Sequence, residues 1–421
     1  MSRPAPRAFL RSLFDRAVAA ADPMRSLAAH LPPRPVGRVV VVGAGKASAR
    51  MAEAVEAAWG PCNGLVITRY GHGRPLQGIE VVEAAHPVPD AAGEAATARM
   101  LSLLDGCGED DFVLVLISGG ASSLLVAPVL GLRLSDKQAI NAALLASGAP
   151  ISAMNTVRKH LSRVKGGQLA AAAHPARLLA LLISDVPGDD PAVIGSGPTI
   201  GEGSTPAEAR AILDHWGVAV PDPVRAALAR PTGVVPPGDP RLDRTETRVI
   251  AAPAQSLAAA AALARERGCE VHVLGDAIEG EASKVAQAMA TQALALQRDR
   301  ASGALPIVLL SGGELTVTRR GDGIGGPNAE FALALALALD GAPGIHALAC
   351  DTDGVDGAAE IAGSIIVPDT LARARAQGLD PAGALAANDA HTFFGRLGDQ
   401  VVTGPTLTNV NDFRAILITG T

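Results

Sequence analysis

The segment Val39–Ala58 reads VVVVGAGKASARMAEAVEAA, which is a valine run, a glycine turn and an alanine-rich stretch. Valine favours strands and alanine favours helices, so the segment predicts a buried strand that turns sharply into a helix. Glycines in such a turn let the backbone approach an anion, and the helix N-terminus supplies free N–H groups. We therefore predict an anion-binding turn that carries Lys46. An ordinary tight turn with a surface lysine is the alternative.

Two familiar phosphate-binding patterns nearly match this turn and fail. A Walker A loop requires a glycine five residues before Gly45, where the chain has Val40. The dinucleotide fingerprint requires a third glycine where Ser48 stands. It also requires an acidic residue at the end of the next strand, and this chain has Arg69 near that position. The turn is therefore predicted to bind an anion without belonging to either class.

Short apolar runs alternate with long alanine-, leucine- and arginine-rich stretches, the pattern of parallel sheets covered by helices on both faces. A proline-rich stretch, residues 221–247, separates two sets of runs and is predicted to be a loop or linker. We expect two Rossmann-like α/β lobes with mainly parallel sheets, residues 1–240 and 241–421, and an active-site cleft between them at the strand ends. The expected strands are 38–42, 65–68, 81–84, 112–117 and 179–184 in the first lobe, and 248–251, 270–274, 306–310, 346–349 and 364–367 in the second.

The tripeptide Ser-Gly-Gly follows an apolar run in both halves, as LVLISGG ending at Gly120 and as VLLSGG ending at Gly313. Small residues and hydroxyl groups at the carboxyl end of a strand favour a phosphate or carboxylate cradle. We predict that Ser118, Gly119, Gly120 and Ser122 contact a ligand, with a purely structural turn as the alternative. The repeat indicates that both halves present polar glycine loops at strand ends.

A basic segment, NTVRKHLSRVKGGQLA at residues 155–170, contains Arg158, Lys159, Arg163 and Lys165. Such a run is either a solvated helix surface or a cationic wall for a carboxylate or a transferring phosphate. An acidic loop, SDVPGDDPAVIGSGPT at residues 184–199, follows a buried strand. Its carboxylates suit Mg²⁺, and one of them could orient or deprotonate an alcohol.

A second acidic loop, CDTDGVDGAAEIAGSI at residues 350–365, brings Asp351, Asp353 and Asp356 together. A calcium loop of this type would end in a glutamate at its twelfth position, where this chain has Ala362. A site for Mg²⁺ and a nucleotide is therefore the better interpretation.

Composition excludes several classes of protein. The net charge of −6 and an aromatic content of 2% argue against a nucleic-acid binder. No apolar run approaches the ~20 residues of a membrane span, and the N-terminus is expected to form an amphipathic helix rather than an export signal. The 4 cysteines lie far apart and are expected to be reduced. We therefore expect a cytoplasmic protein of small-molecule metabolism, and the sequence leaves open whether it forms a homo-oligomer.

Taken together, these segments resemble the class II glycerate 2-kinases, whose C-terminal lobe is the MOFRL domain. The resemblance rests on an ordered series of motifs that spans almost the whole chain. In order, they are GAGKAS, HPVPD, LISGGASSLL, VRKHLSRVKGG, ISDVPGDDPAVIGSGPT, SGGE, GGPNAEFALALA, DTDGVDG and GPTLTNVNDF. Many members of the family carry an arginine where this chain has Pro327, and Arg319, Arg320 or Arg158 could take its role.

The resemblance implies transfer of the γ-phosphoryl group of ATP to the 2-hydroxyl of D-glycerate, with Mg²⁺ as the divalent metal. The catalytic residues would be Lys46, Asp185 and Asp189, and the substrate would contact Ser118, Gly119, Gly120, Ser122, Arg158 and Lys159. The nucleotide would contact Gly43, Gly45, Ser311, Gly312, Gly313, Glu314, Asn328 and Glu330, and the metal would be held by Asp351, Asp353 and Asp356. An NAD(P)H-dependent hydroxypyruvate reductase is the main alternative, because relatives have carried that name. A non-catalytic two-lobed binding protein is another.

Overall fold

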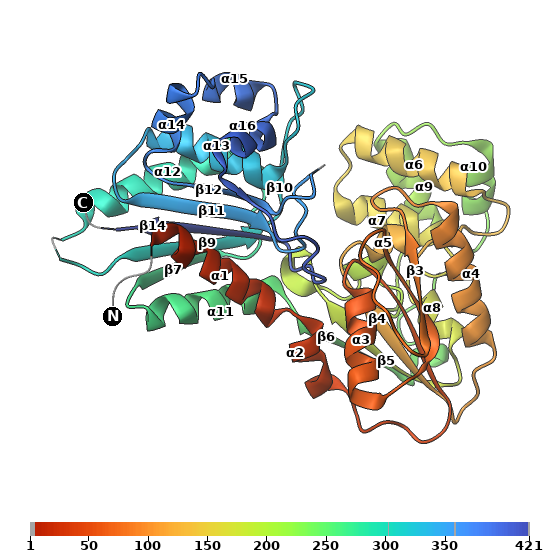
Figure 1. The fold of residues 1–421 in the computed structure, drawn as a ribbon. Helices are drawn as coiled ribbons and strands as arrows, with labels where there is room; N and C mark the ends of the chain where they lie inside the picture. Colours follow the sequence, from red (N-terminus) through yellow and green to blue (C-terminus); the bar gives the residue numbers. More distant parts are fainter. Residues whose placement is uncertain (1–4, 302, 358, 420–421) are drawn as a thin grey trace. The chain divides into compact units, whose positions relative to one another are not determined.

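The computed structural model describes residues 5–301, 303–357 and 359–419 (Figure 1). The chain divides into two compact units. Unit 1 consists of the residues up to Asp22 together with Ala251–Thr421, and unit 2 is Pro23–Ile250. The division thus follows Ile250, and the N-terminal helix joins the unit that the C-terminal half forms.

Unit 2 is built on a six-stranded parallel sheet in the order β3-β2-β1-β4-β5-β6. Helices α4 and α8 cover one face of this sheet and α3 packs on the other, so β1 and β4 are buried on both sides. The strands are β1 Val39–Ala44, β2 Asn63–Arg69, β3 Ile79–Ala84, β4 Phe112–Ile117, β5 Arg177–Ile183 and β6 Thr245–Ala251. The helices are α3 Ser48–Trp59, α4 Ala91–Asp105 and α8 Gln168–Ala172, with α2 Pro23–Ser26 and η1 Leu27–His30 before them.

The five strands expected for the first lobe are confirmed, and their printed pairings are all parallel. The expected strand 248–251 was assigned to the second lobe, which is wrong. It is the end of β6, the edge strand beside β5 in the first sheet. The chain therefore runs once more along this sheet before it enters unit 1.

A second helical layer in unit 2 has a small core of its own. Its helices are α6 Leu134–Ser147, α7 Ile151–His160, α9 Pro206–His215 and α10 Asp222–Leu228. The expectation of a loop or linker over 221–247 is therefore wrong in part, since this stretch contains α10 and the start of β6. Val224 and Leu228, one helical turn apart, are fully buried and give α10 its apolar face despite the neighbouring prolines.

Unit 1 contains a six-stranded mixed sheet in the order β13-β12-β11-β14-β9-β7. Within this six-stranded sheet, the described pairing of β7 with β9 is parallel and the other described pairings are antiparallel. The expectation of a mainly parallel second sheet is therefore wrong, although four of the five strands expected for the second lobe form in it. The strands are β7 Glu270–Gly275, β9 Ile307–Gly313, β11 Ile345–Asp351, β12 Gly363–Ile366, β13 Gln400–Val401 and β14 Asp412–Ile418, with a short pair β8 Gly280–Glu281 and β10 Leu315–Thr316.

Helices on both faces explain why these antiparallel strands are apolar throughout. One face is packed by α12 and α13, and the other by α1 and α11. A continuous apolar sequence indicates that a strand is buried on both faces, but it does not indicate whether the strand runs parallel or antiparallel to its neighbours. The helices are α1 Pro6–Ala20, α11 Pro253–Glu266, α12 Ala282–Asp299, α13 Pro327–Leu339, α14 Thr370–Ala376, α15 Pro381–Ala386 and α16 Ala390–Leu397.

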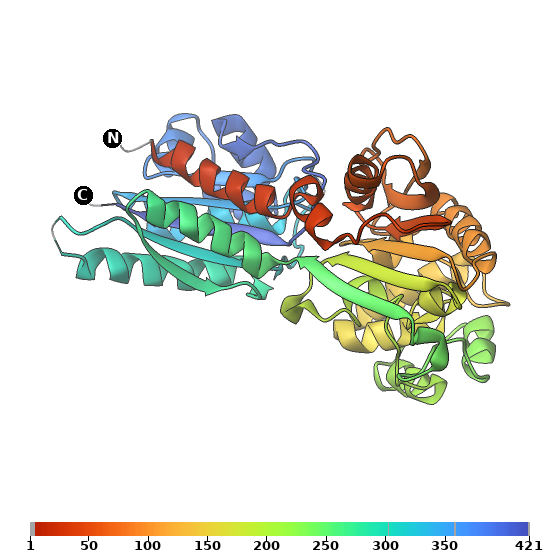
Figure 2. The same cartoon turned by 90° about the horizontal axis from the view of Figure 1, so that it is seen from below.

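The N-terminal amphipathic helix is confirmed as α1, which lies beside α11 on the sheet of unit 1 (Figure 2). Its buried face includes Leu10, Leu13 and Phe14, spaced at three and four residues. Ser256 of α11 donates a hydrogen bond of 2.9 Å to the carbonyl oxygen of Ala17. Helix α1 is therefore an integral part of the core of unit 1.

Candidate functional site

The loops that follow β1 and β4 are joined at the carboxyl edge of the parallel sheet. The two strands are neighbours in register, so their ends meet. The backbone N–H of Lys46 donates to the carbonyl oxygen of Gly119 at 2.8 Å. The N–H of Ala47 donates to Ser118 Oγ at 3.0 Å. The predicted lysine turn and the first Ser-Gly-Gly loop therefore form one structure.

The Lys46 turn and the Ser118–Gly120 loop together form what we call the joint. The two backbones approach closely there, which explains why the joint contains glycines. Gly45 has φ 137°, and a Cβ there would lie 2.1 Å from Ser118 Oγ. Gly120 has φ 82°, and a Cβ there would meet the ring of His86 at 3.0 Å and Lys46 Cγ at 3.3 Å. Lys46 and His86 thus flank Gly120, and all three are half-buried. The structure thus places His86 against this loop.

Gly43 lies within β1 rather than in the turn. A Cβ at this position would sit 2.3 Å from the carbonyl oxygen of Leu116 in β4. Because Gly43 has no Cβ, β1 and β4 can pair closely at this point. Gly43 thus has a packing role in the structure, and its contact with a nucleotide stays a prediction.

A chain of polar side chains runs from the Ser-Gly-Gly loop to the basic helix. Ser122, in the short helix α5 Ala121–Leu124, has its Oγ 2.9 Å from Ser196 Oγ, in η3 Ile194–Ser196. Ser196 Oγ donates to Asn155 Oδ1 at 3.3 Å. Arg158 donates to the same Asn155 oxygen at 3.3 Å, and to Asn141 Oδ1 at 3.4 Å. The structure thus brings the predicted Ser122 and Arg158 into one network, and Asn155 and Ser196 were not predicted.

Lys159 faces away from this network. It is buried, at 7% exposure, and forms an ion pair with Glu202. Consecutive residues on a helix point in different directions, so Arg158 and Lys159 do not share a face. The charge of Lys159 is compensated within the fold.

The predicted acidic loop follows β5, the neighbour of β4, and so starts from the same edge of the sheet. Asp185 and Asp189 are both half-buried. Asp189, in η2 Pro187–Asp189, has φ 54°, and its buried Oδ1 has no hydrogen-bond partner within the described residues. A buried carboxylate oxygen without a donor is unfavourable. This oxygen is therefore suited to accept a hydrogen bond from a ligand hydroxyl.

In unit 1, Ser311, Gly312 and Gly313 lie inside β9 and form no loop beyond a strand. The unforeseen neighbour β14 continues its pairing as far as Gly313, opposite Asp412. The guanidinium of Arg414 donates to the carbonyl oxygens of Gly312 at 2.6 Å and Gly313 at 3.2 Å. The expectation that both Ser-Gly-Gly motifs form equivalent loops is therefore wrong. Glu314, directly after the strand, is exposed.

Asn328 and Glu330 lie buried in the first turn of α13. Asn328 Nδ2 donates to Asp412 Oδ1 at 2.6 Å. Burial raises the pKa of Glu330, although Asn388 Nδ2 donates to its carboxylate at 2.9 Å. Both predicted residues are thus held in a polar network inside unit 1.

The three predicted metal ligands each have a local hydrogen-bonding role. Asp351 accepts from the N–H of Asp353, and Asp353 accepts from the N–H of Val355. Asp356 caps α13, accepting from the N–H groups of Asn328 and the next residue, and also lies 3.1 Å from His391 Nε2. Within the described part of the chain, no group of three or more His, Cys, Asp or Glu is arranged to hold a metal ion. The role of these three carboxylates as Mg²⁺ ligands therefore stays a prediction.

Asn388 orders the glycine-rich stretch between β10 and α13, and the sequence did not point to it. Its Oδ1 accepts from the N–H groups of Arg320 at 2.7 Å and Gly321 at 3.0 Å. The adjacent Asp389 accepts from the N–H of Ile324 at 2.9 Å. The exposed side chains of Arg319 and Arg320 are thus carried on an ordered turn.

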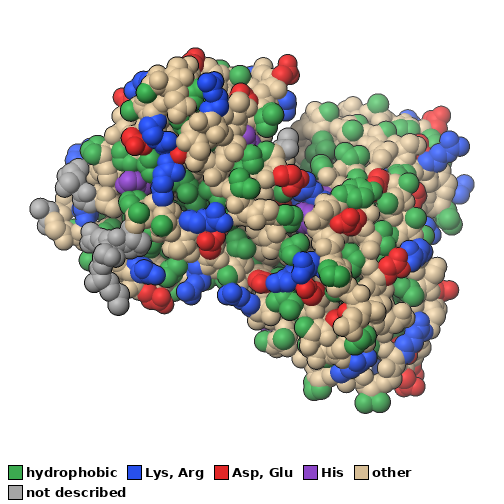
Figure 3. Space-filling model, in the orientation of Figure 1, with side chains coloured by type: hydrophobic (Ala, Val, Ile, Leu, Met, Phe, Trp, Pro, Cys, Tyr) green, Lys and Arg blue, Asp and Glu red, His purple; other side chains and the backbone are tan. Residues whose placement is uncertain are grey.

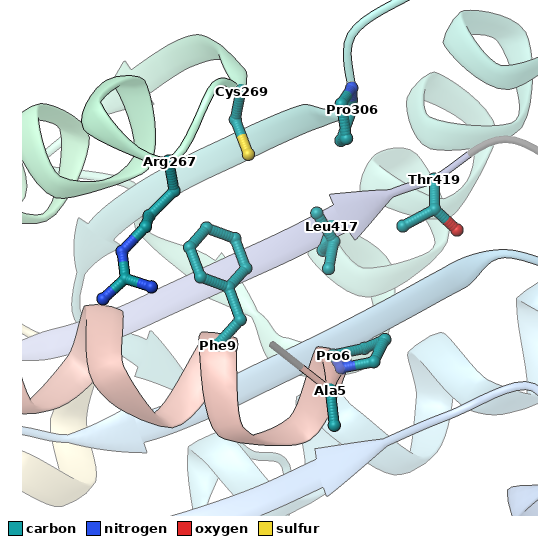
Figure 4. Close-up of a pocket in the computed structure, with 8 residues that line it drawn as sticks. All are labelled: Ala5, Pro6, Phe9, Arg267, Cys269, Pro306, Leu417 and Thr419. Atoms are coloured by element: carbon teal, nitrogen blue, oxygen red, sulfur yellow. The ribbon is translucent and has the colours of Figure 1, made fainter. Parts of the chain in front are cut away.

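Other surface features are separate from these residues. A pocket of about 320 Å³ in unit 1 is lined by Phe9, Cys269 and Leu417, with Arg267 at its side (Figure 4). On the face drawn in Figure 3, acidic and basic side chains are interspersed with apolar ones. Among the helices that the structure describes, none is long and apolar enough to cross a membrane.

Known proteins resemble this chain over nearly its full length. The family described as "Domain of unknown function (DUF4147)" matches residues 9–229, and the MOFRL family matches residues 307–412. A "Putative hydroxypyruvate reductase" of Agrobacterium vitis is 52% identical, covering 98% of this chain and 94% of its own. The D-glycerate 2-kinase of Thermotoga maritima is 38% identical, covering 94% of each. The crystal structure of a glycerate kinase from Thermotoga maritima matches with a TM-score of 0.87 and 37% identity, covering 98% of this chain and 99% of that one.

Proposed function

Because this chain belongs to the glycerate kinase family, with its DUF4147 and MOFRL regions, we propose that it transfers the γ-phosphoryl group of ATP to the 2-hydroxyl of D-glycerate. The product would be 2-phosphoglycerate. The observation that carries the proposal is the joint between the Lys46 turn and the Ser118–Gly120 loop. It holds a half-buried lysine at the ligand-binding edge of a parallel sheet.

Phosphoryl transfer depends mainly on positioning and on neutralising charge, since the protein has little covalent chemistry to perform. Lys46 would neutralise charge on the transferring phosphoryl group or on the bound substrate. The backbone around Gly119 and Gly120 would place an anionic group beside the ammonium of Lys46. This role is supported by the fixed backbone of the turn, whose N–H groups bond to the neighbouring loop.

The 2-hydroxyl of the substrate would be oriented by a carboxylate of the acidic loop. Asp189 is better suited than Asp185, because its Oδ1 is buried without a donor in the described residues. Accepting the hydroxyl proton would satisfy that oxygen and direct the alcohol oxygen toward the phosphorus atom.

The substrate carboxylate would bind Arg158, supported by Ser122. Lys159 is a weaker candidate for this contact, because Glu202 already compensates its charge. Arg158 therefore takes the clamping role that was predicted for both basic residues.

The residues that we predict to contact the nucleotide in unit 1 lie near the start of α13 and around Glu314. Mg²⁺ would enter with the phosphates of ATP, since it usually keeps substrate phosphates and waters among its ligands. Its chemistry there would be to neutralise the charge of the phosphate oxygens. We assign no step to Asp351, Asp353 or Asp356, because their oxygens already serve the fold.

The name of the Agrobacterium vitis relative makes hydroxypyruvate reduction the second candidate. The turn at Gly45 argues against it. Ser48 stands where a dinucleotide site needs its third glycine, and its buried hydroxyl bonds to the carbonyl oxygens of Gly45 and Ile67, both at 2.8 Å. The side chain therefore occupies the position at which the third glycine of a dinucleotide site lets the helix pack closely against the strand.

The test is to incubate the full-length protein with ATP, Mg²⁺ and D-glycerate and to identify the product by ³¹P NMR. A 2-phosphoglycerate signal is expected. A 3-phosphoglycerate signal would keep the kinase and overturn the assigned hydroxyl. No phosphorylated product, together with oxidation of NADH by hydroxypyruvate, would replace this proposal with the reductase.

A further inference from the structure

Three cationic side chains of unit 2 are buried close to the Ser-Gly-Gly loop. Lys137 of α6 is 2% exposed, and Lys165, between α7 and α8, is 0% exposed. Arg158 of α7 is half-buried. Lysine and arginine are almost never buried without a partner, because removing their charge from water is costly. Their environment therefore requires an explanation.

Neutral oxygen atoms are the hydrogen-bond partners of these three cations. Lys165 Nζ donates to the carbonyl oxygens of Ser122 at 2.8 Å and Leu125 at 3.1 Å. Lys137 Nζ donates to the carbonyl oxygen of Leu161 at 3.3 Å. Arg158 donates to two asparagine side chains. Within the described residues, no ion pair joins any of the three to a carboxylate, in contrast to the pairing of Lys159 with Glu202.

The three charges also act on one another. Burial, with repulsion from Arg158, lowers the pKa of Lys137 to about 7. Burial, with repulsion from Lys137 and Arg158, lowers the pKa of Lys165 well below its ordinary value. Each lysine therefore loses its proton more readily than a free lysine, and no carboxylate among the described residues pairs with either of them to oppose this.

The polar network described above connects this cluster to solvent. Lys165 binds the backbone of Ser122, whose hydroxyl begins the chain through Ser196 and Asn155 to Arg158. Ser122 and Arg158 are half-buried, so part of each residue is exposed to solvent. Hydroxyl and guanidinium groups are the donors that bind oxyanions.

We propose that Ser122, Ser196 and Arg158 form a binding site for a small oxyanion, and that the bound anion holds the buried Lys137 and Lys165 in their charged forms, so that they balance its charge. The inference rests on the proposed function in one respect: the oxyanion would be the carboxylate of the hydroxy-acid substrate or a phosphate group. Neither Lys137 nor Lys165 touches the ligand in this assignment, and both act as positioning residues.

The test uses the full-length variant Lys137→Met, with Lys284→Met as the matched control. Lys284 is an exposed lysine of α12, in unit 1. Isothermal titration calorimetry measures the affinity for D-glycerate and, separately, for inorganic phosphate. Scanning calorimetry without ligand measures the melting temperature.

Methionine keeps the length of the side chain and removes its charge. We expect Lys137→Met to weaken oxyanion binding by on the order of 10- to 100-fold, as one unit charge several ångströms away would contribute in a partly buried site. We also expect its melting temperature to equal or exceed that of the parent, because an uncompensated buried charge is removed. A lysine with a purely structural role would instead lower the melting temperature and leave the affinity unchanged.

Arg158→Gln is the second variant, for the case in which Lys137→Met does not fold. Unchanged affinity for both probes in the folded variants would overturn the proposal. Weaker binding of D-glycerate assigns the site to the carboxylate, and weaker binding of phosphate alone assigns it to a phosphate group. Loss of affinity in a protein that makes no phosphoglycerate would refute the proposed function and leave this inference standing.

Discussion

The joint between the two loops of unit 2 predicts the effect of adding one methyl group at Gly45. In Gly45→Ala, the new Cβ would lie 2.1 Å from Ser118 Oγ and 2.6 Å from the carbonyl oxygen of Ser118. Ordinary contacts of a Cβ begin at about 3.4 Å, so the two loops must separate by more than about 1 Å. Residue 45 also has φ 137°, which an L-residue adopts at a cost of roughly 1–2 kcal/mol.

This displacement would move the Lys46 turn relative to Gly119 and Gly120. A misplacement of about 1 Å costs on the order of 100-fold in rate when positioning dominates catalysis. We therefore expect kcat/KM for D-glycerate to fall by about that factor in Gly45→Ala, measured by coupled release of ADP. The melting temperature should fall by several degrees at most.

Gly275→Ala is the matched control, because Gly275 has φ 136° and the nearest atom to its Cβ position is Ile278 Cγ1, at an ordinary contact distance of 3.9 Å. It carries the backbone strain without the collision, so its activity should equal that of the parent. Ser118→Ala should not rescue Gly45→Ala, because the carbonyl oxygen of residue 118 still obstructs the methyl group. Activity of Gly45→Ala within threefold of the control would refute the idea that the contact between the loops sets the catalytic geometry.

Three further predictions concern individual charges. Lys46→Ala should lower kcat/KM by roughly 100- to 1,000-fold, as expected for a lost electrostatic contact in the transition state, and should not lower the melting temperature. Lys284→Ala is the control. Activity of Lys46→Ala close to that of the parent would show that Lys46 has no part in the mechanism. Arg414→Met leaves Asp412 buried without its cationic partner, so urea unfolding should report a loss of about 3–5 kcal/mol, and a loss below about 1 kcal/mol would contradict the pairing. The effect of burial outweighs that of Arg414 and raises the pKa of Asp412 to about 6. The folded state therefore binds the proton of Asp412 more tightly than the unfolded state does. Because of this, the contribution of Asp412 to the free energy of unfolding falls as pH rises from about 4 to 6. Asp412→Asn should remove this decline, on the order of 3 kcal/mol, from the pH profile of unfolding, and an unchanged profile would show that Asp412 stays ionised throughout.

Most strands could be predicted because burial on both faces leaves a plain record in the sequence. The valines of β1 and the apolar run of β4 are buried; β4 has the expected bounds, and β1 ends two residues later than expected. Strand direction leaves no such record. The strands of unit 1 are as apolar as those of unit 2, since helices cover both faces of each sheet, although most of their pairings are antiparallel.

The strand β14 was missed for a physical reason. Its sequence, DFRAILI, begins with an acidic and a basic residue, a pattern that favours a surface segment. In the structure Asp412 and Arg414 are buried and pair with each other at 3.1 Å, and Arg414 also packs over the ring of Phe331 at 5.7 Å. The groups that make this burial tolerable lie more than eighty residues away in the chain, so a local pattern could not show them.

A local sequence pattern also does not distinguish the two Ser-Gly-Gly motifs, whose surroundings differ in the structure. At Ser118 the motif follows the end of β4 and meets the Lys46 turn. At Ser311 it stays within β9, because β14 pairs with β9 as far as Gly313 and Arg414 binds the carbonyl oxygens of Gly312 and Gly313. Arg414 and Lys159 each form an ion pair with a carboxylate of this chain, so the fold alone explains why both are buried. Lys137 and Lys165 have none among the described residues. A buried lysine to which the chain supplies no counter-charge would be held in its charged form by a ligand that supplies that charge, and this criterion favours the oxyanion site of unit 2.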